Sequence, residues 1–204
     1  MIKLIVRASL LAAMLMAVTA VANADPTYLT RGCFGVACAP AIADSLTVGG
    51  GSLVYTGQLN TALNVAPGSF TAAQLGQFTW VGAPSGTVGP TAFTLEVTLI
   101  SPAPGGQLSF TAVVSGTVSG GASTTNVSFT NTLITFSNGV ILELTNLGGP
   151  GTIGPNSLLI NPPGQTTSVQ SITRIPGVPE PTSMLLLGTG LVGVAGAVRR
   201  RFKK

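Results

Sequence analysis

The sequence lacks histidine entirely, and charged side chains make up only 7% of its 204 residues. Histidine is the most common general base and metal ligand in proteins, so chemistry that depends on imidazole is excluded. The five acidic residues are too few to suggest a calcium site, which needs several carboxylate ligands. From these absences we expect no catalytic, cofactor-binding or metal-ligating residues, no cofactor and no enzymatic activity.

The formal net charge of +4 belongs to the two ends of the chain rather than to its middle. Seven of the nine basic residues lie in the first seven or the last six positions, and only Arg31 and Arg174 lie between them. Within residues 25–180, these two arginines stand against five acidic residues, which gives a charge of −3. A nucleic-acid-binding domain needs a basic patch on its folded part. Nucleic acid is therefore excluded as a partner.

The N-terminus has the three parts of a secretory signal. Two basic residues precede an uncharged run over residues 8–21 that is rich in Leu, Met and Ala. Ala22 and Ala24 then place small side chains at the positions that signal peptidase recognises. The alternative is a first transmembrane helix, but the run is shorter than the roughly 20 apolar residues that span a bilayer. We predict a signal helix at 1–24 that signal peptidase removes.

Cysteine is scarce, with only Cys33 and Cys38 present. In an oxidising compartment such a close pair can form a local disulfide, which would stiffen a turn without contributing much stability because the loop is small. Four residues separate the pair, whereas a redox C-x-x-C motif has two, and a zinc site would need further ligands. A structural disulfide is the favoured interpretation.

The C-terminus contains an apolar segment between a proline-rich motif and a basic tail. Residues 182–198 carry no charge and, as a helix, would be near the short limit for a membrane span. The preceding motif consists of Val178, Pro179, Glu180 and Pro181. The tail that follows, which should remain cytoplasmic and stop translocation, contains Arg199, Arg200, Arg201, Lys203 and Lys204. A plain C-terminal membrane anchor is the simpler alternative.

The order of Pro-Glu-Pro, short glycine-rich apolar helix and terminal basic cluster resembles the PEP-CTERM sorting signal of Gram-negative bacteria. The resemblance covers residues 178–204. It implies that an exosortase-like membrane enzyme processes this chain, with the inner membrane as a transient anchor. Because proline fixes φ and lacks an N–H, Pro179 and Pro181 should hold the motif extended outside the bilayer, with Glu180 as its one charge. The resemblance also implies delivery to the cell surface or to an exopolysaccharide or biofilm matrix, with extracellular polysaccharide as a candidate partner.

Residues 25–177 indicate a β-rich exported domain. Runs rich in Val, Thr, Phe and Leu alternate with Gly, Pro, Asn and Ser, which is typical of strands and turns. The clearest strand is 91–100, where every second residue is apolar. Other strands are expected at 52–60, 70–80, 108–114, 124–136, 140–145, 157–160 and 166–175. A helical turn at 71–77 is the alternative for part of 70–80. About eight strands predict an all-β, antiparallel sandwich or jelly-roll-like body.

Several glycines and one asparagine predict how these strands connect. Gly105-Gly106 and Gly120-Gly121 should turn the chain, and Asn138-Gly139 is typical of a two-residue hairpin. The alternation of apolar residues changes phase near Asn131, which predicts a bulge or a change of sheet there. Glycine-rich loops are expected at 84–90 and 146–155.

The rival interpretation of the body is a carbohydrate-binding or hydrolytic domain that carries the same sorting signal. Glu96 and Glu143 are the only carboxylates in mid-domain, and glycosidases use a pair of carboxylates. Tyr55 and Trp80 could stack on a sugar, although both residue types are buried to a large extent in most domains. A cleft that brings these residues together would favour the rival. We expect solvated strand carboxylates and a structural or binding protein.

Overall fold

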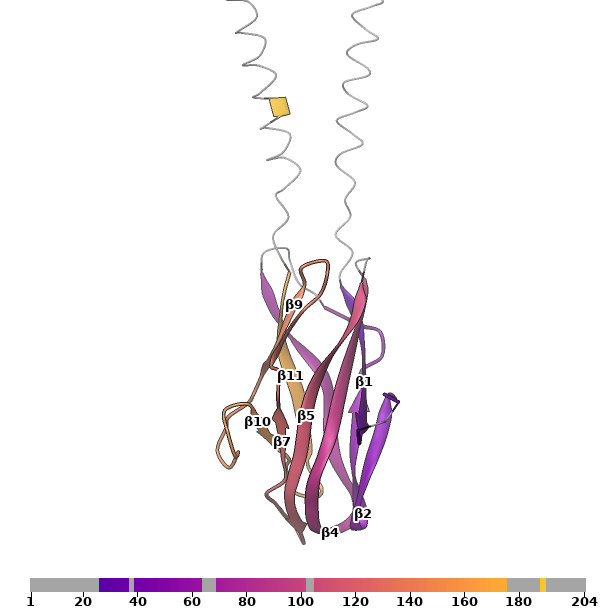
Figure 1. Ribbon diagram of the computed structural model, residues 1–204, viewed down its shortest axis with the longest axis vertical. Helices are drawn as coiled ribbons and strands as arrows, with labels where there is room; N and C mark the ends of the chain where they lie inside the picture. The colour runs from indigo at the N-terminus through magenta and orange to yellow at the C-terminus, as the bar shows by residue number, and fades with distance from the viewer. Residues whose placement is uncertain (1–25, 37–38, 64–68, 102–104, 176–187, 190–204) are drawn as a thin grey trace, which may run out of the picture. The chain divides into compact units, whose positions relative to one another are not determined.

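The computed structural model shows an all-β, antiparallel domain (Figure 1). It describes residues 26–36, 39–63, 69–101, 105–175 and 188–189. The strands are β1 (Thr27–Phe34), β2 (Ala43–Gly57), β3 (Thr61–Ala62), β4 (Phe70–Ser101), β5 (Gly106–Ser119), β6 (Ala122–Ser123), β7 (Asn126–Phe129), β8 (Leu133–Thr135), β9 (Ile141–Thr145), β10 (Ser157–Leu159) and β11 (Thr166–Arg174). The all-β antiparallel class is thus confirmed. The predicted signal helix and membrane helix fall outside the described residues, apart from Gly188 and Thr189.

Strand β4 organises the sheet, because its two parts belong to two halves that face each other. Residues 70–84 pair with β11 and β2, and residues 85–101 pair with β5 and β1. Beyond these neighbours, β7 and β10 extend the β5 side, while β9 and β8 extend the β11 side. The rings of Phe78, in the first part of β4, and Phe93, in the second, lie 5.1 Å apart. The sheet therefore curls around one core, as the twisting ribbons of Figure 1 show.

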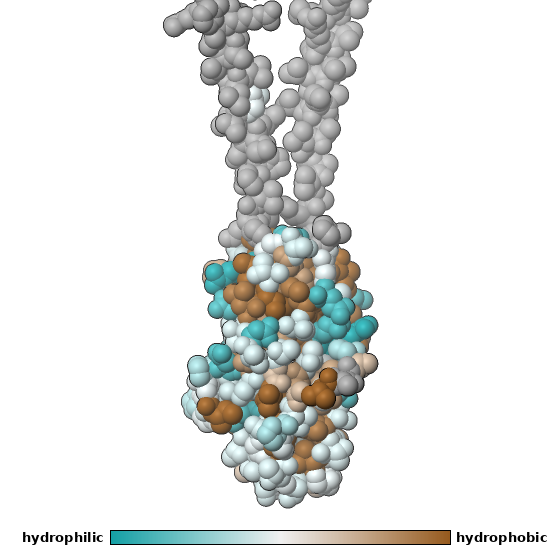
Figure 2. Space-filling model, in the orientation of Figure 1, coloured by the Kyte–Doolittle hydropathy of each residue, from teal (hydrophilic) through white to brown (hydrophobic). Residues whose placement is uncertain are grey.

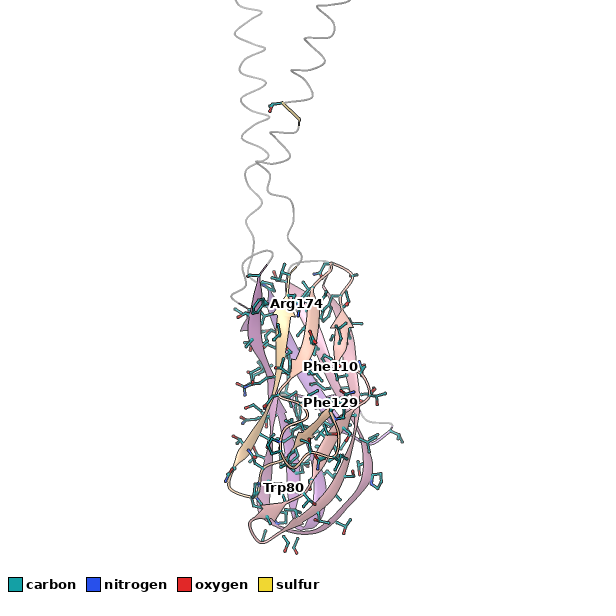
Figure 3. All side chains as sticks on the ribbon, turned by 90° about the vertical axis from the view of Figure 1, so that its left-hand side faces the viewer. Trp80, Phe110, Phe129 and Arg174 are labelled. Atoms are coloured by element: carbon teal, nitrogen blue, oxygen red, sulfur yellow. The ribbon has the colours of Figure 1, made fainter. Side chains whose placement is uncertain are left out.

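The core consists of the alternate, inward-facing residues of both halves. In the expected strand 91–100, Phe93, Leu95, Val97 and Leu99 are all buried, so the alternation read from the sequence is confirmed. The same holds for Val140, Leu142 and Leu144 around β9, and for Phe110, Ala112 and Val114 in β5. Figure 3 places the buried Trp80 toward one end of the domain and Arg174, where β11 ends, toward the other.

The loop expected at residues 84–90 is wrong, because these residues lie inside β4. The pairing of β4 with β2 ends at Pro84 and its pairing with β5 begins at Ser85, so this segment carries the chain from one half to the other. Proline has no N–H for a ladder, and Pro90 falls where the pairing with β5 shifts register. Gly82 has a positive φ, which allows a bend that other residues rarely adopt. Prolines and glycines that resemble a loop in sequence thus mark a corner within one strand.

Two other expectations about this region are corrected. Residues 71–77 are extended within β4, so the alternative of a helical turn is wrong. Strand β2 begins at Ala43, well before the expected strand 52–60, and β1 was missed altogether. The first missed stretch contains Cys33, where a stiffened turn was expected, and the second contains the glycines 49–51. They are extended because they pair with, or lie beside, the long β4.

A bulge and a change of sheet were the two predicted causes of the phase change near Asn131. The structure shows the second: the chain crosses here from one half of the sheet to the other. Strand β7 pairs with β5, whereas β8 pairs with β9. The Asn131 side chain holds this crossing to β5: its Oδ1 accepts from the Thr111 N–H at 2.9 Å, and its Nδ2 donates to the Ser109 carbonyl at 3.0 Å. The polar side chain thereby satisfies backbone groups that no strand covers at this point.

Two of the predicted turns are present, one of them with a different loop length. Gly120 and Gly121 both have positive φ and connect β5 to β6. Asn138 and Gly139 lie in the hairpin between β8 and β9, but the loop has three residues rather than two, because the Phe136 N–H donates to the Val140 carbonyl. Gly139, whose φ is also positive, occupies the left-handed position that such three-residue loops require.

Candidate functional sites: a polar pocket and the sorting motif

A polar pocket of about 370 Å³ lies where β10, β11 and the loop before β10 meet. Its hydrogen-bonding side chains come from Asn146, Thr152, Asn161, Thr166, Ser168 and Gln170. The alternation of β11 provides three of them, because Thr166, Ser168 and Gln170 face outward while Thr167 and Val169 are buried. Sequence reasoning missed this pocket, because it joins residues up to 24 positions apart that carry no recognisable motif.

The loop before β10 is held in place by its own backbone and by hydroxyl groups. The Thr152 hydroxyl donates to the Gly149 carbonyl at 2.7 Å, and the Gly148 N–H donates to the Ser157 carbonyl at 2.9 Å. Asn146 begins the loop with a positive φ, in a left-handed conformation that asparagine tolerates better than most residues. On the other side of the pocket, the Asn161 Nδ2 donates to the Thr166 carbonyl at 2.7 Å. The pocket therefore has fixed walls.

The carboxylates that could have formed a hydrolytic site lie on different parts of the sheet. Glu143 lies on β9 and forms an ion pair with Arg174 at 3.5 Å, with side chains 44% and 59% exposed. Glu96 lies in the second part of β4, opposite Arg31 of β1. Both glutamates alternate with buried aliphatic residues, so they face outward from different halves of the sheet. The prediction that each is a strand residue on an outer face is confirmed.

The aromatic residues considered for sugar stacking are in the core. Tyr55 is fully buried and donates to the Leu75 carbonyl at 2.7 Å, and Trp80 is 4% exposed. Burial raises the pKa of both tyrosines, that of Tyr28 to about 12 and that of Tyr55 further still. With their pKa values raised, both tyrosine hydroxyls stay protonated near neutral pH. Stacking of a sugar on Tyr55 or Trp80 would require the core to open.

Cys33 is the one member of the predicted disulfide that the structure describes. It is buried near the end of β1 and is not a free thiol. Cys38 lies outside the described residues, and the Cys33–Cys38 pairing stays a prediction. The neighbouring Phe34 N–H donates to the Asp44 carboxylate at 2.7 Å, which ties the end of β1 to the start of β2.

The remaining predicted site residues also lie outside the described part of the chain. These are Ala22, Ala24, Val178, Pro179, Glu180, Pro181, Arg199, Arg200, Arg201, Lys203 and Lys204. What the structure does fix is the end of the domain: β11 finishes at Arg174, four residues before Val178. A family model described as the PEP-CTERM protein-sorting motif matches residues 177–201. The chain carries a PEP-CTERM sorting motif.

This match bears out the resemblance seen at the C-terminus. A PEP-CTERM motif implies an exported protein that is anchored transiently in a membrane and is targeted to an exosortase-type membrane enzyme. The match covers the C-terminal segment alone, and neither the curated proteins nor the solved structures contain a match to the chain. Within the described ranges, no helix is both long and apolar enough to cross a bilayer.

Proposed function

We propose that this PEP-CTERM protein is processed by an exosortase and delivered to the cell surface or the extracellular matrix of a Gram-negative bacterium, where its β-domain has a structural or binding role. The observation that carries the proposal is the sorting motif at 177–201. Its position directly after β11 supports it, because the domain is complete before the motif begins. Cleavage within the motif would therefore release a whole domain. Signal peptidase is the second processing enzyme in this proposal.

The low charge of the domain supports a structural or binding role that does not depend on charged side chains. Figure 2 shows a face composed mainly of weakly polar and apolar residues, with strongly hydrophilic residues in several separate patches. The chain has 27 glycines and only 7% charged residues, and a domain with so little charge suits a durable component of a matrix. The proposal includes no enzymatic activity. The hydrolytic alternative loses its support because Glu96 and Glu143 face outward from different halves of the sheet.

The proposal is tested by the intact mass of the protein recovered from the culture medium and from membranes. We expect a released form that begins at Asp25 and ends between Pro179 and Pro181. A Glu180→Ala variant should accumulate with its tail intact, because it removes the one charge of the motif. Glu143→Ala, which removes an exposed carboxylate from the folded domain, is the matched control and should be processed normally. Recovery only of a membrane form ending at Lys204 would overturn the proposal.

A further inference from the structure

We infer that the pocket between β10, β11 and the loop 146–156 binds a neutral saccharide unit. The inference rests on the binding role proposed above and names the ligand class. The volume of the pocket falls within the range typical of small-molecule sites. The four lining residues that carry the argument are Asn146, Thr166, Ser168 and Gln170.

The fold does not use the hydrogen-bonding groups of these four side chains. Within the described residues, none of the four makes a side-chain hydrogen bond to another part of the chain. In contrast, the neighbouring Thr167 hydroxyl faces inward and accepts from the Asn161 N–H at 2.7 Å. One face of β11 thus supports the structure, while the other presents free donors and acceptors to the pocket.

The lining of the pocket is polar and carries no charge among its described residues. Most small-molecule pockets are largely apolar, but this lining consists mainly of amides and hydroxyls, and none of the described residues in it is acidic or basic. Amide and hydroxyl groups both donate and accept hydrogen bonds. A ligand that matches them must also carry several groups that do both, without a formal charge. Sugar hydroxyls have this property, whereas phosphate and carboxylate groups accept only and would lack a cationic partner here.

The pocket is organised before any ligand arrives. Asn146 is held in the left-handed region, and the loop behind it is fixed by the Thr152 hydroxyl and the Gly148 N–H. Ser168 and Gln170 stand on β11, which pairs with β4 at both positions and with β9 from Gln170 onward. A rigid site loses less conformational freedom on binding, which favours affinity for a ligand with many weak contacts. None of the described residues that line the pocket is aromatic, so we expect hydrogen bonds rather than stacking to dominate.

The test measures binding to the full-length, unprocessed chain in detergent micelles. The probes are three neutral tetrasaccharides, built from β-1,4-glucose, α-1,2-mannose and β-1,4-N-acetylglucosamine, and binding is followed by calorimetry and by saturation-transfer NMR. We expect at least one probe to bind with a dissociation constant below about 1 mM, equivalent to roughly −4 kcal/mol. The double variant Ser168→Ala/Gln170→Ala should weaken that binding by about tenfold or more.

Strand β5 offers a matched control for this variant. Gln107 and Ser109 are exposed, lie two positions apart on an outer face and are absent from the pocket lining. Gln107→Ala/Ser109→Ala should therefore leave binding unchanged. Asn146→Gly, which keeps the left-handed conformation accessible, is a second pocket variant and should also weaken binding. Fluorescence of the buried Trp80 checks that every variant is folded.

The inference would be overturned if no probe bound at concentrations up to about 10 mM, a range that covers weak sites. It would also be overturned if both pocket variants bound as tightly as the parent. Loss of binding by the β5 variant to the same extent as by the pocket variants would overturn it as well. Because the test uses the unprocessed chain, its failure would leave exosortase processing untouched. A chain that binds saccharide but is never cleaved would fail the sorting proposal alone.

Discussion

The Tyr55 hydroxyl donates a 2.7 Å hydrogen bond to the carbonyl of Leu75, which links β2 to a bulge in β4. The bulge arises because β11 pairs Val169 with Gly76 and Gln170 with Gln74, so Leu75 has no partner in the ladder. Thr30 of β1 donates to the same carbonyl. A buried carbonyl without a partner would cost about 1–3 kcal/mol, so these hydroxyls make the bulge possible and join three strands.

Gly76→Ala should destabilise the domain by about 2–4 kcal/mol. A Cβ at this position would lie 2.4 Å from the Tyr55 hydroxyl oxygen and 2.7 Å from the Thr56 carbonyl oxygen, and the residue has a positive φ. Urea unfolding followed by Trp80 fluorescence measures the loss. Gly89→Ala is the control and should have a much smaller effect, since nothing lies within 4 Å of its added Cβ. Equal unfolding midpoints for the two variants would show that the bulge tolerates a side chain.

The domain should lose stability in alkaline solution as its tyrosines ionise. Burial raises the pKa of Tyr28 to about 12 and that of Tyr55 further, whereas tyrosine in an unfolded chain titrates near pH 10. The unfolded state releases the tyrosine protons at a lower pH than the folded state does. The contribution of the two tyrosines to the free energy of unfolding is therefore complete below about pH 10 and declines as the pH rises through about 12. The free energy of unfolding, measured between about pH 8 and 12 beside tyrosinate absorbance, tests this.

The Tyr55→Phe variant separates the two tyrosines in that experiment. It should start from a lower stability at neutral pH, because one donor to the Leu75 carbonyl is lost, and should then decline less steeply above about pH 10. The chain contains only these two tyrosines. A decline as steep as that of the parent would assign the alkaline transition to Tyr28 or to another group.

Thr173→Val should stabilise the domain by about 1 kcal/mol. The Thr173 hydroxyl is fully buried on the inner face of β11 and has no hydrogen-bond partner among the residues described, and valine has nearly the same shape. Thr167→Val is the matched comparison on the same face. It removes the acceptor of the Asn161 N–H and should destabilise by about 1 kcal/mol. Thermal unfolding of both variants checks that their stabilities change in opposite directions. A loss of stability in Thr173→Val would indicate that the Thr173 hydroxyl is bonded to an internal water molecule.

Glu143→Gln should change the free energy of unfolding by less than about 0.5 kcal/mol. The ion pair with Arg174 is 3.5 Å long and joins two largely exposed side chains, so solvent and salt screen it. The variant should also show little dependence on added salt relative to the parent. A loss of more than about 1 kcal/mol would mean that the end of β11 depends on this pair.

The parts of the fold that were predictable follow from local patterns. Alternation in 91–100 and 140–145 identified the buried residues, since a strand presents successive side chains to opposite faces. The phase change at Asn131 correctly located a crossing between the two halves. The pocket was not predictable, because the pairing of β11 with β9, rather than any local spacing, sets Gln170 opposite Thr145 and so brings it to the start of the loop at Asn146. The outward placement of Glu96 and Glu143 was predictable for the same reason as the core.

The sequence by itself determined that this protein carries a sorting motif and that its domain is all-β. The Pro-Glu-Pro motif, the apolar run and the basic tail carry their meaning in a contiguous stretch, and alternation in the strands is equally local. Tertiary structure alone decided that residues 84–90 continue β4, that Leu75 bulges toward Tyr55 and that Ser168 and Gln170 line a pocket. Each of these depends on pairing between residues distant in the chain. Such pairing satisfies the hydrogen bonds of the backbone and buries side chains, and it costs chain entropy because distant segments must meet. A short stretch of sequence does not show which distant segment it will pair with.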